Sequence, residues 1–263
     1  MGSKGDGKFP DRLGKSPYID VLDLCPSIQK NINWEKVAQS GVKGVIIKSS
    51  QYSKTSMLAY DSYADAASKA GLSVGAYHFA ACDSDHVLQA EFFLRRMKDF
   101  GLRPGDIPPM MDLEYAKETL PKKGRQYIVD WGVMFMRRVQ QEMLNLHLKA
   151  RPIWYTFPYF ADSLQPELSK SVLATDWDLN IANYRDNKAP LAAWYPPDGY
   201  TPPRVPKGCR KPILTQYSGN GGYWVPGINQ DVDRNIFFGS QGDWAEFRGV
   251  DRPVHSTEYE VKE

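Results

Sequence analysis

The stretch "GVIIKSSQYSKTSMLAYDSYADAASKAGLSVGAYHFAA", residues 44–81, decides the fold class. It contains an apolar run at 44–50, a helical segment at 57–71 that ends at a glycine, and a second apolar run at 72–81. A strand, a helix and a strand in this order are typical of a parallel sheet. Both runs are nearly continuous in apolar residues, as expected when each face of the sheet is covered.

The same alternation continues on both sides of this stretch. Further strands are expected at 18–24, 107–115, 151–157, 177–184, 211–218 and 231–239, and helices at 32–41, from Ser84 or Asp85 to about Phe100, and at 124–149. The longest helix has apolar residues at three- and four-residue steps, namely Ile128, Trp131, Phe135, Val139 and Met143. Seven or eight strands in one domain favour a barrel over an open sheet. The loop-forming segment "YPPDGYTPPRVPKG" at 195–208 predicts that the second half is irregular. We therefore predict an α/β fold, an irregular TIM-like (β/α) barrel in a single domain.

The barrel is expected over residues 18–240, between a flexible N-terminal segment (1–17) and a C-terminal tail (241–263). The first 17 residues lack the apolar core of a secretory signal peptide, and no apolar run reaches the ~18–20 residues of a membrane span. The net charge of +2, from 33 basic and 31 acidic residues, gives no reason to expect nucleic acid or membrane insertion. Cys25, Cys82 and Cys209 show neither metal-ligand spacing nor a disulfide framework, so reduced thiols are expected, with a single bridge as the alternative.

Two carboxylates, Asp112 and Glu114, stand two residues apart at the end of the strand expected at 107–115. Residues i and i+2 of a strand point the same way, about 6.5–7 Å apart. Two close carboxylates raise each other's proton affinity, and a protonated acid beside an ionised one is what glycosidic bond cleavage requires. The alternatives are an ordinary solvated pair or a metal ligand.

Other polar residues also fall at strand ends, where parallel α/β folds build their sites. They are Asp20, Asp23, Lys48, Tyr77, His78, Tyr155, Thr156, Asn183, Tyr184, Gln216, Tyr217, Asp231 and Asp233. The chain is also rich in aromatic residues, with seven Trp, fifteen Tyr and eleven Phe. These rings either pack the core or line a carbohydrate groove, since aromatic faces stack on sugar CH groups.

The segments "YIDV", "GVIIKSS", "AGLSVGAYHFA", "PPMMDLE", "IWYTFPYF", "IANY", "QYS" and "VDRNIFFG" resemble, in order and spacing, the glycoside hydrolase family 25 lysozymes. These are Chalaropsis-type N-acetylmuramidases, many of them bacteriophage endolysins, and the resemblance covers about residues 18–239. It implies a flattened, irregular TIM-like barrel with a groove at the strand C-termini. It also implies hydrolysis of the β-1,4 bond between N-acetylmuramic acid and N-acetylglucosamine in peptidoglycan glycan strands, with retention.

The resemblance also assigns roles to individual residues. Glu114 would be the general acid and base, and Asp112 would orient the substrate's N-acetyl group or stabilise the oxocarbenium-like state; a substrate-assisted route is favoured over a nucleophilic Asp112. Asp20 of "YIDV" would be the first-strand aspartate and Asp233 the acid before the closing segment, with Asp231 as its rival. After "YIDV" the chain continues "LDLCP", where the family usually has Ser-His-Trp-Gln. Substrate-binding residues are expected to be Tyr77, His78, Tyr155, Asn183, Tyr184, Gln216, Tyr217, Lys48 and Asp231.

His78 and Lys48 leave alternatives open. His78 is either structural or groove-lining, and it has no second His or Cys at ligand spacing, so no metal and no cofactor are expected. Lys48 either pairs with Asp20 or its neighbours and lowers their pKa, or forms a plain structural salt bridge. A non-catalytic wall-binding or virion structural module and a chitinase-like hydrolase are the alternative functions. A monomer is expected, held in the host cytoplasm until lysis or associated with a virion.

Overall fold

The computed structural model describes residues 18–116, 119–184, 204–219 and 225–250. Its strands are β1 (Ile19–Leu24), β2 (Gly44–Gln51), β3 (Thr55–Ser56), β4 (Ser73–Phe79), β5 (Met110–Asp112), β6 (Ile153–Thr156), β7 (Asp178–Ala182), β8 (Leu214–Ser218) and β9 (Asp233–Phe237). Its helices are α1 (Trp34–Gln39), α2 (Tyr60–Lys69), α3 (His86–Phe100), α4 (Thr119–Asn145), α5 (Pro158–Ser163) and α6 (Gln241–Phe247), with short 3₁₀ turns at Leu168–Lys170 and Val172–Ala174.

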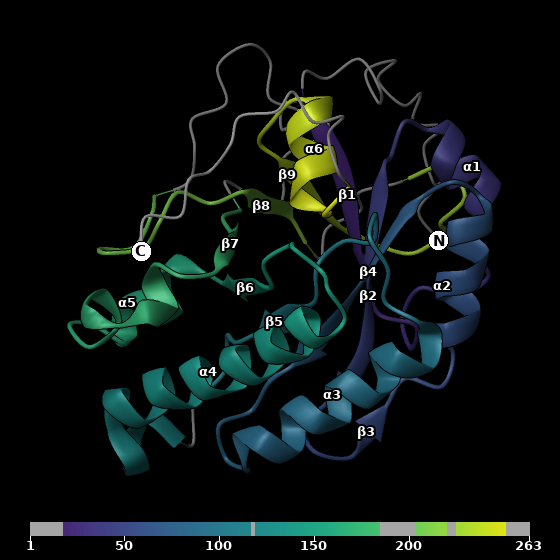
Figure 1. Cartoon of the computed structure of the whole chain (residues 1–263). Helices are drawn as coiled ribbons and strands as arrows, with labels where there is room; N and C mark the ends of the chain where they lie inside the picture. The colour runs from purple at the N-terminus through teal and green to yellow at the C-terminus, as the bar shows by residue number, and fades with distance from the viewer. Residues whose placement is uncertain (1–17, 117–118, 185–203, 220–224, 251–263) are drawn as a thin grey trace, which may run out of the picture.

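Eight strands close into one barrel (Figure 1). Their order is β1-β9-β8-β7-β6-β5-β4-β2, and a parallel pairing of β1 with β2 completes the circle. The short β3 adds to the edge of β2 in antiparallel fashion. The predicted single α/β barrel is therefore confirmed.

The last strand departs from the parallel arrangement that the sequence predicts. β9 is antiparallel to both of its neighbours, β1 and β8. The described part of the connection before it holds a small bridge between Val225 and Ile228 in place of a crossover helix. A strand's residue pattern carries no information on its direction, so the sequence could not show this reversal.

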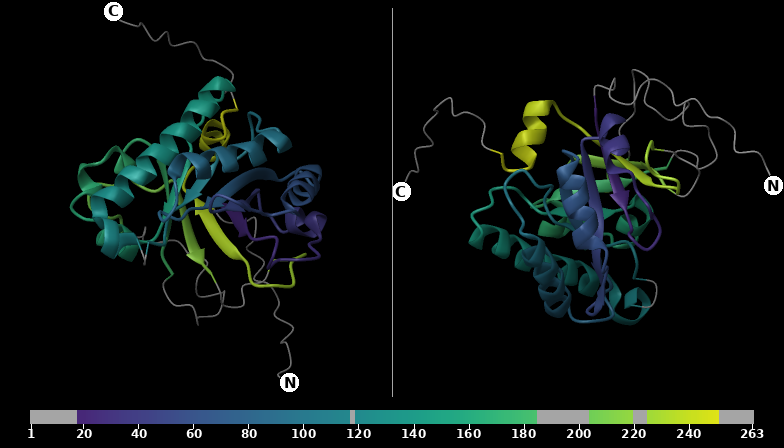
Figure 2. Two further views of the ribbon diagram at one scale, coloured as in Figure 1. Left: turned by 90° about the horizontal axis from the view of Figure 1, so that it is seen from below. Right: turned by 90° about the vertical axis from the view of Figure 1, so that its right-hand side faces the viewer.

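Strand alternation divides the core into two layers. Inside the barrel lie side chains such as Ile19, Val21, Ile46, Met110 and Ile153. Between the strands and the helices lie their sequence neighbours, including Leu22, Val45, Ile47, Met111 and Trp154. Helices α3 and α4 lie along one side of the barrel, whereas β8 and β9 lie on the opposite side (Figure 2).

The helix boundaries follow their capping residues. The Asn33 side chain accepts a hydrogen bond from Lys36 N at 3.0 Å, and the Asp85 carboxylate accepts from Val87 N at 2.7 Å. Helix α3 ends at Gly101, whose φ of +85° suits a residue without Cβ. Helix α4 begins five residues before the predicted start and kinks at Gly124, and its predicted apolar stripe from Ile128 to Met143 is buried as expected.

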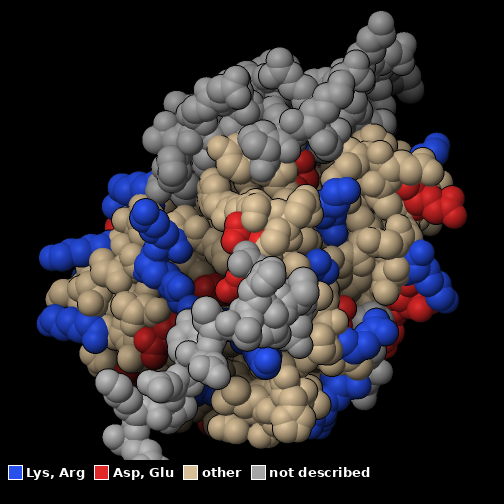
Figure 3. Space-filling model, turned by 45° about the horizontal axis from the view of Figure 1, so that its top comes forward, with Lys and Arg blue, Asp and Glu red and all other residues tan. Residues whose placement is uncertain are grey.

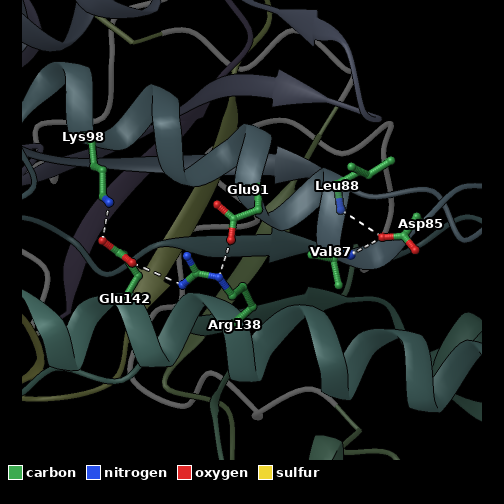
Figure 4. A network of polar contacts seen from close by, with 7 residues as sticks. All are labelled: Asp85, Val87, Leu88, Glu91, Lys98, Arg138 and Glu142. Carbon is green, nitrogen blue, oxygen red and sulfur yellow. Dashed lines mark hydrogen bonds and ion pairs between the residues drawn. The ribbon is translucent and has the colours of Figure 1, made fainter.

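A chain of ion pairs joins α3 to α4 (Figure 4). Lys98 Nζ lies 2.6 Å from Glu142, and Arg138 bridges Glu142 to Glu91. Hydrogen bonds from Lys98 and then Arg138 lower the pKa of the Glu142 carboxyl. This network fixes the helix that follows β4 against the helix that follows β5.

The predicted C-terminal tail contains structure at its beginning. Residues 241–247 form α6, whose Trp244 and Phe247 are buried against Phe237. Trp244 also lies close to Gly44 at the start of β2, so α6 covers the end of the barrel at which the parallel strands begin. The described structure thus continues past the expected boundary at residue 240, as far as residue 250. The predicted segment 1–17 and the remainder of the tail lie outside the described residues.

Three further expectations concern the cysteines, membrane-spanning segments and surface charge. All three cysteines are free thiols. No described helix is both long enough and apolar enough to cross a bilayer. On the described surface seen in Figure 3, basic and acidic side chains are interspersed with uncharged ones, in keeping with the balanced net charge.

Candidate active site

A groove with two arms opens where the parallel strands end. The first, here named the acidic arm, has a volume of about 440 Å³ and is lined by Asp23, Lys48, Asp112, Gln216, Asp231 and Asp233, among others. The second, here named the aromatic arm, has a volume of about 630 Å³ and is lined by Phe157, Tyr159, Asp162, Asn183, Tyr184 and Arg204, among others. Glu114 and Tyr155 line both arms, so they mark the junction.

Asp112 and Glu114 project into this groove together, as their spacing predicts. Leu113 between them points to the helix layer, and its N–H donates to Tyr155 O at 3.1 Å, so extended pairing continues past the end of β5. Asp112 is only 6% exposed, and its Oδ1 accepts no hydrogen bond from the described residues. Burial, followed by the charges of Glu114 and Asp23, raises the pKa of Asp112 well above its usual value. Burial also raises the pKa of Glu114.

Asp23 is the acid of β1 that faces the groove. It shares the inward side of the strand with Ile19 and Val21 and lies opposite Asp233 in the β1–β9 register. Burial, and then the charges of Asp233 and Glu114, raise the pKa of Asp23 well above its ordinary value. Asp23, Asp112, Glu114 and Asp233 therefore form one cluster of acids at the barrel mouth.

Asp20 lies on the other side of the same strand, so its predicted place in the groove is wrong. Its carboxylate is 3.3 Å from Arg234, whose side chain is fully buried, and Tyr217 Oη donates to it at 3.5 Å. The Arg234 guanidinium also lies 5.4 Å from the centroid of the Tyr217 ring. The predicted groove-lining role of Tyr217 is therefore wrong too, because residues 20, 217 and 234 all point outward.

Gln216 connects the two arms through its amide. Its Oε1 accepts hydrogen bonds from Tyr155 Oη, at 2.8 Å, and from Tyr184 Oη. Its Nε2 donates to Asp23 Oδ2 at 3.2 Å. Two hydroxyl donors fix the orientation of the amide, so its NH₂ group is directed at the Asp23 carboxylate.

Asp233 and Asp231 both line the acidic arm, but they differ in depth. Asp233 is half-buried, and its charge helps to raise the pKa of Asp23 and Asp112. Asp231 is exposed at the rim, and its backbone O accepts a hydrogen bond from Gln29 Nε2 at 2.5 Å. The residue that follows the reversal into β9, Asp233, is thus the one placed among the other acids.

Lys48 brings a positive charge to the acidic arm. Its Nζ donates to Gln51 Oε1 at 2.6 Å and lies 4.6 Å from the centroid of the Phe79 ring. The lysine charge lowers the pKa of Asp23, Asp112 and Glu114, against the larger effect of burial. The predicted pairing with Asp20 is wrong because Asp20 faces the opposite way, whereas the predicted influence on neighbouring acids holds.

Tyr77 faces the groove and His78 faces the helices, just as Asp23 and Asp20 lie on opposite sides of β1. Tyr77 lines the acidic arm as predicted. His78 instead is fully buried between strand and helices, where its ring bonds to Ser50 and Gln89 and stacks on Phe135. Burial lowers the pKa of His78 to about 4, so the ring is neutral. Its predicted substrate contact is wrong, and the structural alternative is correct.

Asn183, Tyr184 and Tyr155 line the aromatic arm as predicted. The groove is also lined by residues outside the predicted set, among them Gln29, Phe157, Tyr159 and Arg204. Phe157 and Tyr159 stand in the quoted segment "IWYTFPYF", directly after the end of β6, and this position was the available signal. Among the described residues, no group of His, Cys, Asp and Glu side chains is arranged to hold a metal ion.

Comparison with known proteins identifies the family of the chain. The family model "Glycosyl hydrolases family 25" matches residues 22–201. The chain belongs to this family. The family and the enzyme class that the sequence predicts, a glycoside hydrolase, are therefore confirmed. The matched range begins at residue 22, so it includes Asp23 and leaves out Asp20.

Similar proteins include curated and solved examples. Lysozyme M1 of Streptomyces globisporus is 25% identical over 247 residues, covering 90% of this chain and 75% of that protein. The lysozyme of Streptomyces coelicolor superposes with a TM-score of 0.71 at 22% identity, covering 88% of this chain and 97% of that one. A family 25 lysozyme of Aspergillus fumigatus gives a TM-score of 0.69 at 21% identity, covering 88% and 99%. These structural likenesses confirm the barrel fold of this family 25 glycoside hydrolase.

Proposed function

We propose that the chain is a peptidoglycan muramidase, a lysozyme that hydrolyses the β-1,4 bond between N-acetylmuramic acid and N-acetylglucosamine. Membership of the family and the similarity to Lysozyme M1 support the substrate class. The observation that carries the chemistry is the cluster of Asp23, Asp112, Glu114 and Asp233 at the mouth of the barrel, in which the first two are buried and the other two half-buried. The expected monomer and the expected location before lysis stay predictions from the sequence.

Glu114 would act as the general acid. It stands at the junction of the two arms, and its raised pKa keeps a proton available for the leaving oxygen. As the C1–O bond breaks, positive charge develops on the sugar ring. The ionised acids of the acidic arm then lie where they stabilise that charge.

Asp112 would hold the N-acetyl group of the substrate. Its buried Oδ1 has no hydrogen-bond donor among the described residues, and an acetamide N–H directed into the arm would supply one. The carbonyl oxygen of that acetamide attacks the anomeric carbon while Glu114 protonates the leaving oxygen. Glu114 then removes a proton from water, and the water oxygen displaces the acetamide oxygen with overall retention.

Product analysis tests this function. The full chain is incubated with purified peptidoglycan, the soluble fragments are reduced with borohydride, and the terminal sugar alcohols are identified by mass spectrometry. We expect fragments that end in reduced muramic acid. Fragments ending in reduced glucosamine would contradict the bond assignment, and activity confined to chitin oligomers would favour the chitinase-like alternative. Binding to peptidoglycan without any release of reducing ends would favour a non-catalytic module.

A further inference from the structure

The two arms of the groove differ in chemistry on either side of Glu114. Every other acid of the cluster lies in the acidic arm. The aromatic arm holds Phe157, Tyr159 and Tyr184, and the one acid among its described lining residues besides Glu114, Asp162, is paired with Arg204. The groove therefore changes from rich in carboxyl groups to aromatic at the residue that would donate the proton.

This polarity fixes the direction of the substrate, on the basis of the proposed function. The sugar that becomes cationic must lie among the ionised acids, so it occupies the acidic arm. Glu114 protonates the oxygen that leaves that sugar, and the leaving sugar therefore lies beyond Glu114. The space beyond Glu114 is the aromatic arm.

Tyr159 has the properties of a platform for that leaving sugar. It is 81% exposed although it lines the arm, and it lies in the first turn of α5, directly after Pro158. The helix start is anchored by Phe157 and the buried Phe160, whose ring centroids are 6.1 Å apart. An exposed ring on an anchored turn offers a stacking face with little ordering cost.

We propose that the aromatic arm binds the leaving-group side of the glycan, an N-acetylglucosamine unit and the chain beyond it, with Tyr159 as the stacking platform that selects polymeric over short substrates. Tyr184 contributes from the end of the neighbouring strand β7, where its hydroxyl bond to Gln216 orients its ring. Because the Tyr159 ring contacts only the departing part of the substrate, it acts on recognition of that part and leaves the chemistry at the anomeric carbon untouched.

The test compares two substrates that differ in the group that leaves the anomeric carbon. One is a peptidoglycan glycan strand, and the other is a GlcNAc–MurNAc disaccharide with 4-nitrophenol as its leaving group. We expect Tyr159→Ala to lower kcat/KM on the glycan strand about tenfold, which corresponds to about 1.4 kcal/mol, and to leave the nitrophenyl substrate within about twofold of wild type. Tyr159→Phe, which retains the ring, should behave as wild type on both substrates.

Leu58→Ala serves as a control, because Leu58 is also strongly exposed and does not line either arm. Wild-type activity of Tyr159→Ala on glycan strands would overturn the inference, and so would an equal loss on both substrates. A wild-type chain that cleaves neither substrate would instead overturn the proposed function, and this inference with it. The two failures are thus told apart by the wild-type rates alone.

Discussion

The two faces of β1, β8 and β9 carry similar sets of polar residues, but one set lines the groove and the other is buried outside the barrel. On the inward face, Asp23, Gln216 and Asp233 surround the groove. On the outward face, Asp20, Tyr217 and Arg234 contact one another and are buried. Each set contains an acid from β1 and one residue from each of the other strands; the two acids are three positions apart, and the residues of β8 and of β9 are adjacent in the chain.

The difference between the faces lies in how their charges are compensated. The outward carboxylate is paired with a guanidinium, and both side chains are at most 4% exposed. The inward carboxylates face one another, and burial together with mutual repulsion raises their pKa values. The outward set therefore stabilises the barrel, whereas the inward set destabilises the free protein and is available to a substrate.

The largest expected effect belongs to the inward face. Glu114→Gln should lower kcat on purified peptidoglycan by about 10²–10⁴-fold, because the amide is not acidic enough to transfer a proton to the leaving oxygen. The thermal midpoint should not fall. Glu35→Gln, at an exposed position on α1, is the matched control and should keep full activity. Release of reducing ends by Glu114→Gln within tenfold of wild type would remove Glu114 from the mechanism.

The outward face should respond in stability rather than in catalysis. Asp20→Asn removes the carboxylate charge that lies 3.3 Å from the buried Arg234, and we expect the free energy of unfolding to fall by about 3–5 kcal/mol. Urea denaturation measures this change. The double variant Asp20→Leu/Arg234→Met, which removes both charges, should recover most of the loss. A single variant as stable as wild type would show that the pair is not the stabilising element described here.

Adjacent residues of β8 sharpen the same contrast. Gln216→Leu removes the hydrogen bond to Asp23 and should lower kcat about tenfold, with a small change in the thermal midpoint. Tyr217→Phe removes a long hydrogen bond to Asp20 and should cost at most ~1 kcal/mol of stability, with kcat unchanged. Kinetics and melting curves of the two variants are measured together. A loss of kcat in Tyr217→Phe with full activity of Gln216→Leu would refute the assignment of faces.

The smallest effect concerns the dependence of stability on pH. In the folded protein the pKa of Asp112 is raised, so between its unfolded value of about 4 and its folded value the native state binds more protons than the unfolded state. The free energy of unfolding contributed by this group therefore falls as pH rises through that window. Asp112→Asn should be more stable than wild type at pH 7 and should lose this advantage below pH 4. Urea denaturation at pH 7 and below pH 4 measures both free energies of unfolding. A difference between variant and wild type that is the same at both pH values would contradict the raised pKa.

The sequence predicts those features that depend on local periodicity. The apolar stripe of α4, the caps Asn33 and Asp85, and the barrel itself follow from the spacing of apolar and capping residues. Asp112 and Glu114 could be assigned to the same face as each other, because residues two apart on a strand point the same way whether that face is inward or outward. The reversal of β9 has no such local signal.

The same reasoning explains why the sequence favours Asp20 over Asp23 as the aspartate of β1 in the groove. All six residues of β1 are buried, so neither hydrophobicity nor polarity distinguishes its inward side from its outward side. The motif "YIDV" then favoured the wrong aspartate. Tyr77 and His78 present the same ambiguity on β4, where five consecutive residues are buried. Arg204 has no local signal, because only the tertiary fold brings α5 beside residue 204.

The central claim is that the acids on the inward face, Asp23 included, perform the chemistry, and that Asp20 does not. The most direct measurement is kcat on purified peptidoglycan for Asp23→Asn and Asp20→Asn, side by side, at a temperature where circular dichroism shows both variants folded. We expect Asp23→Asn to lose about 10²-fold in kcat, since it removes a charge that stabilises the cationic sugar, and Asp20→Asn to retain the wild-type value. Full activity of Asp23→Asn together with an inactive but folded Asp20→Asn would contradict the account.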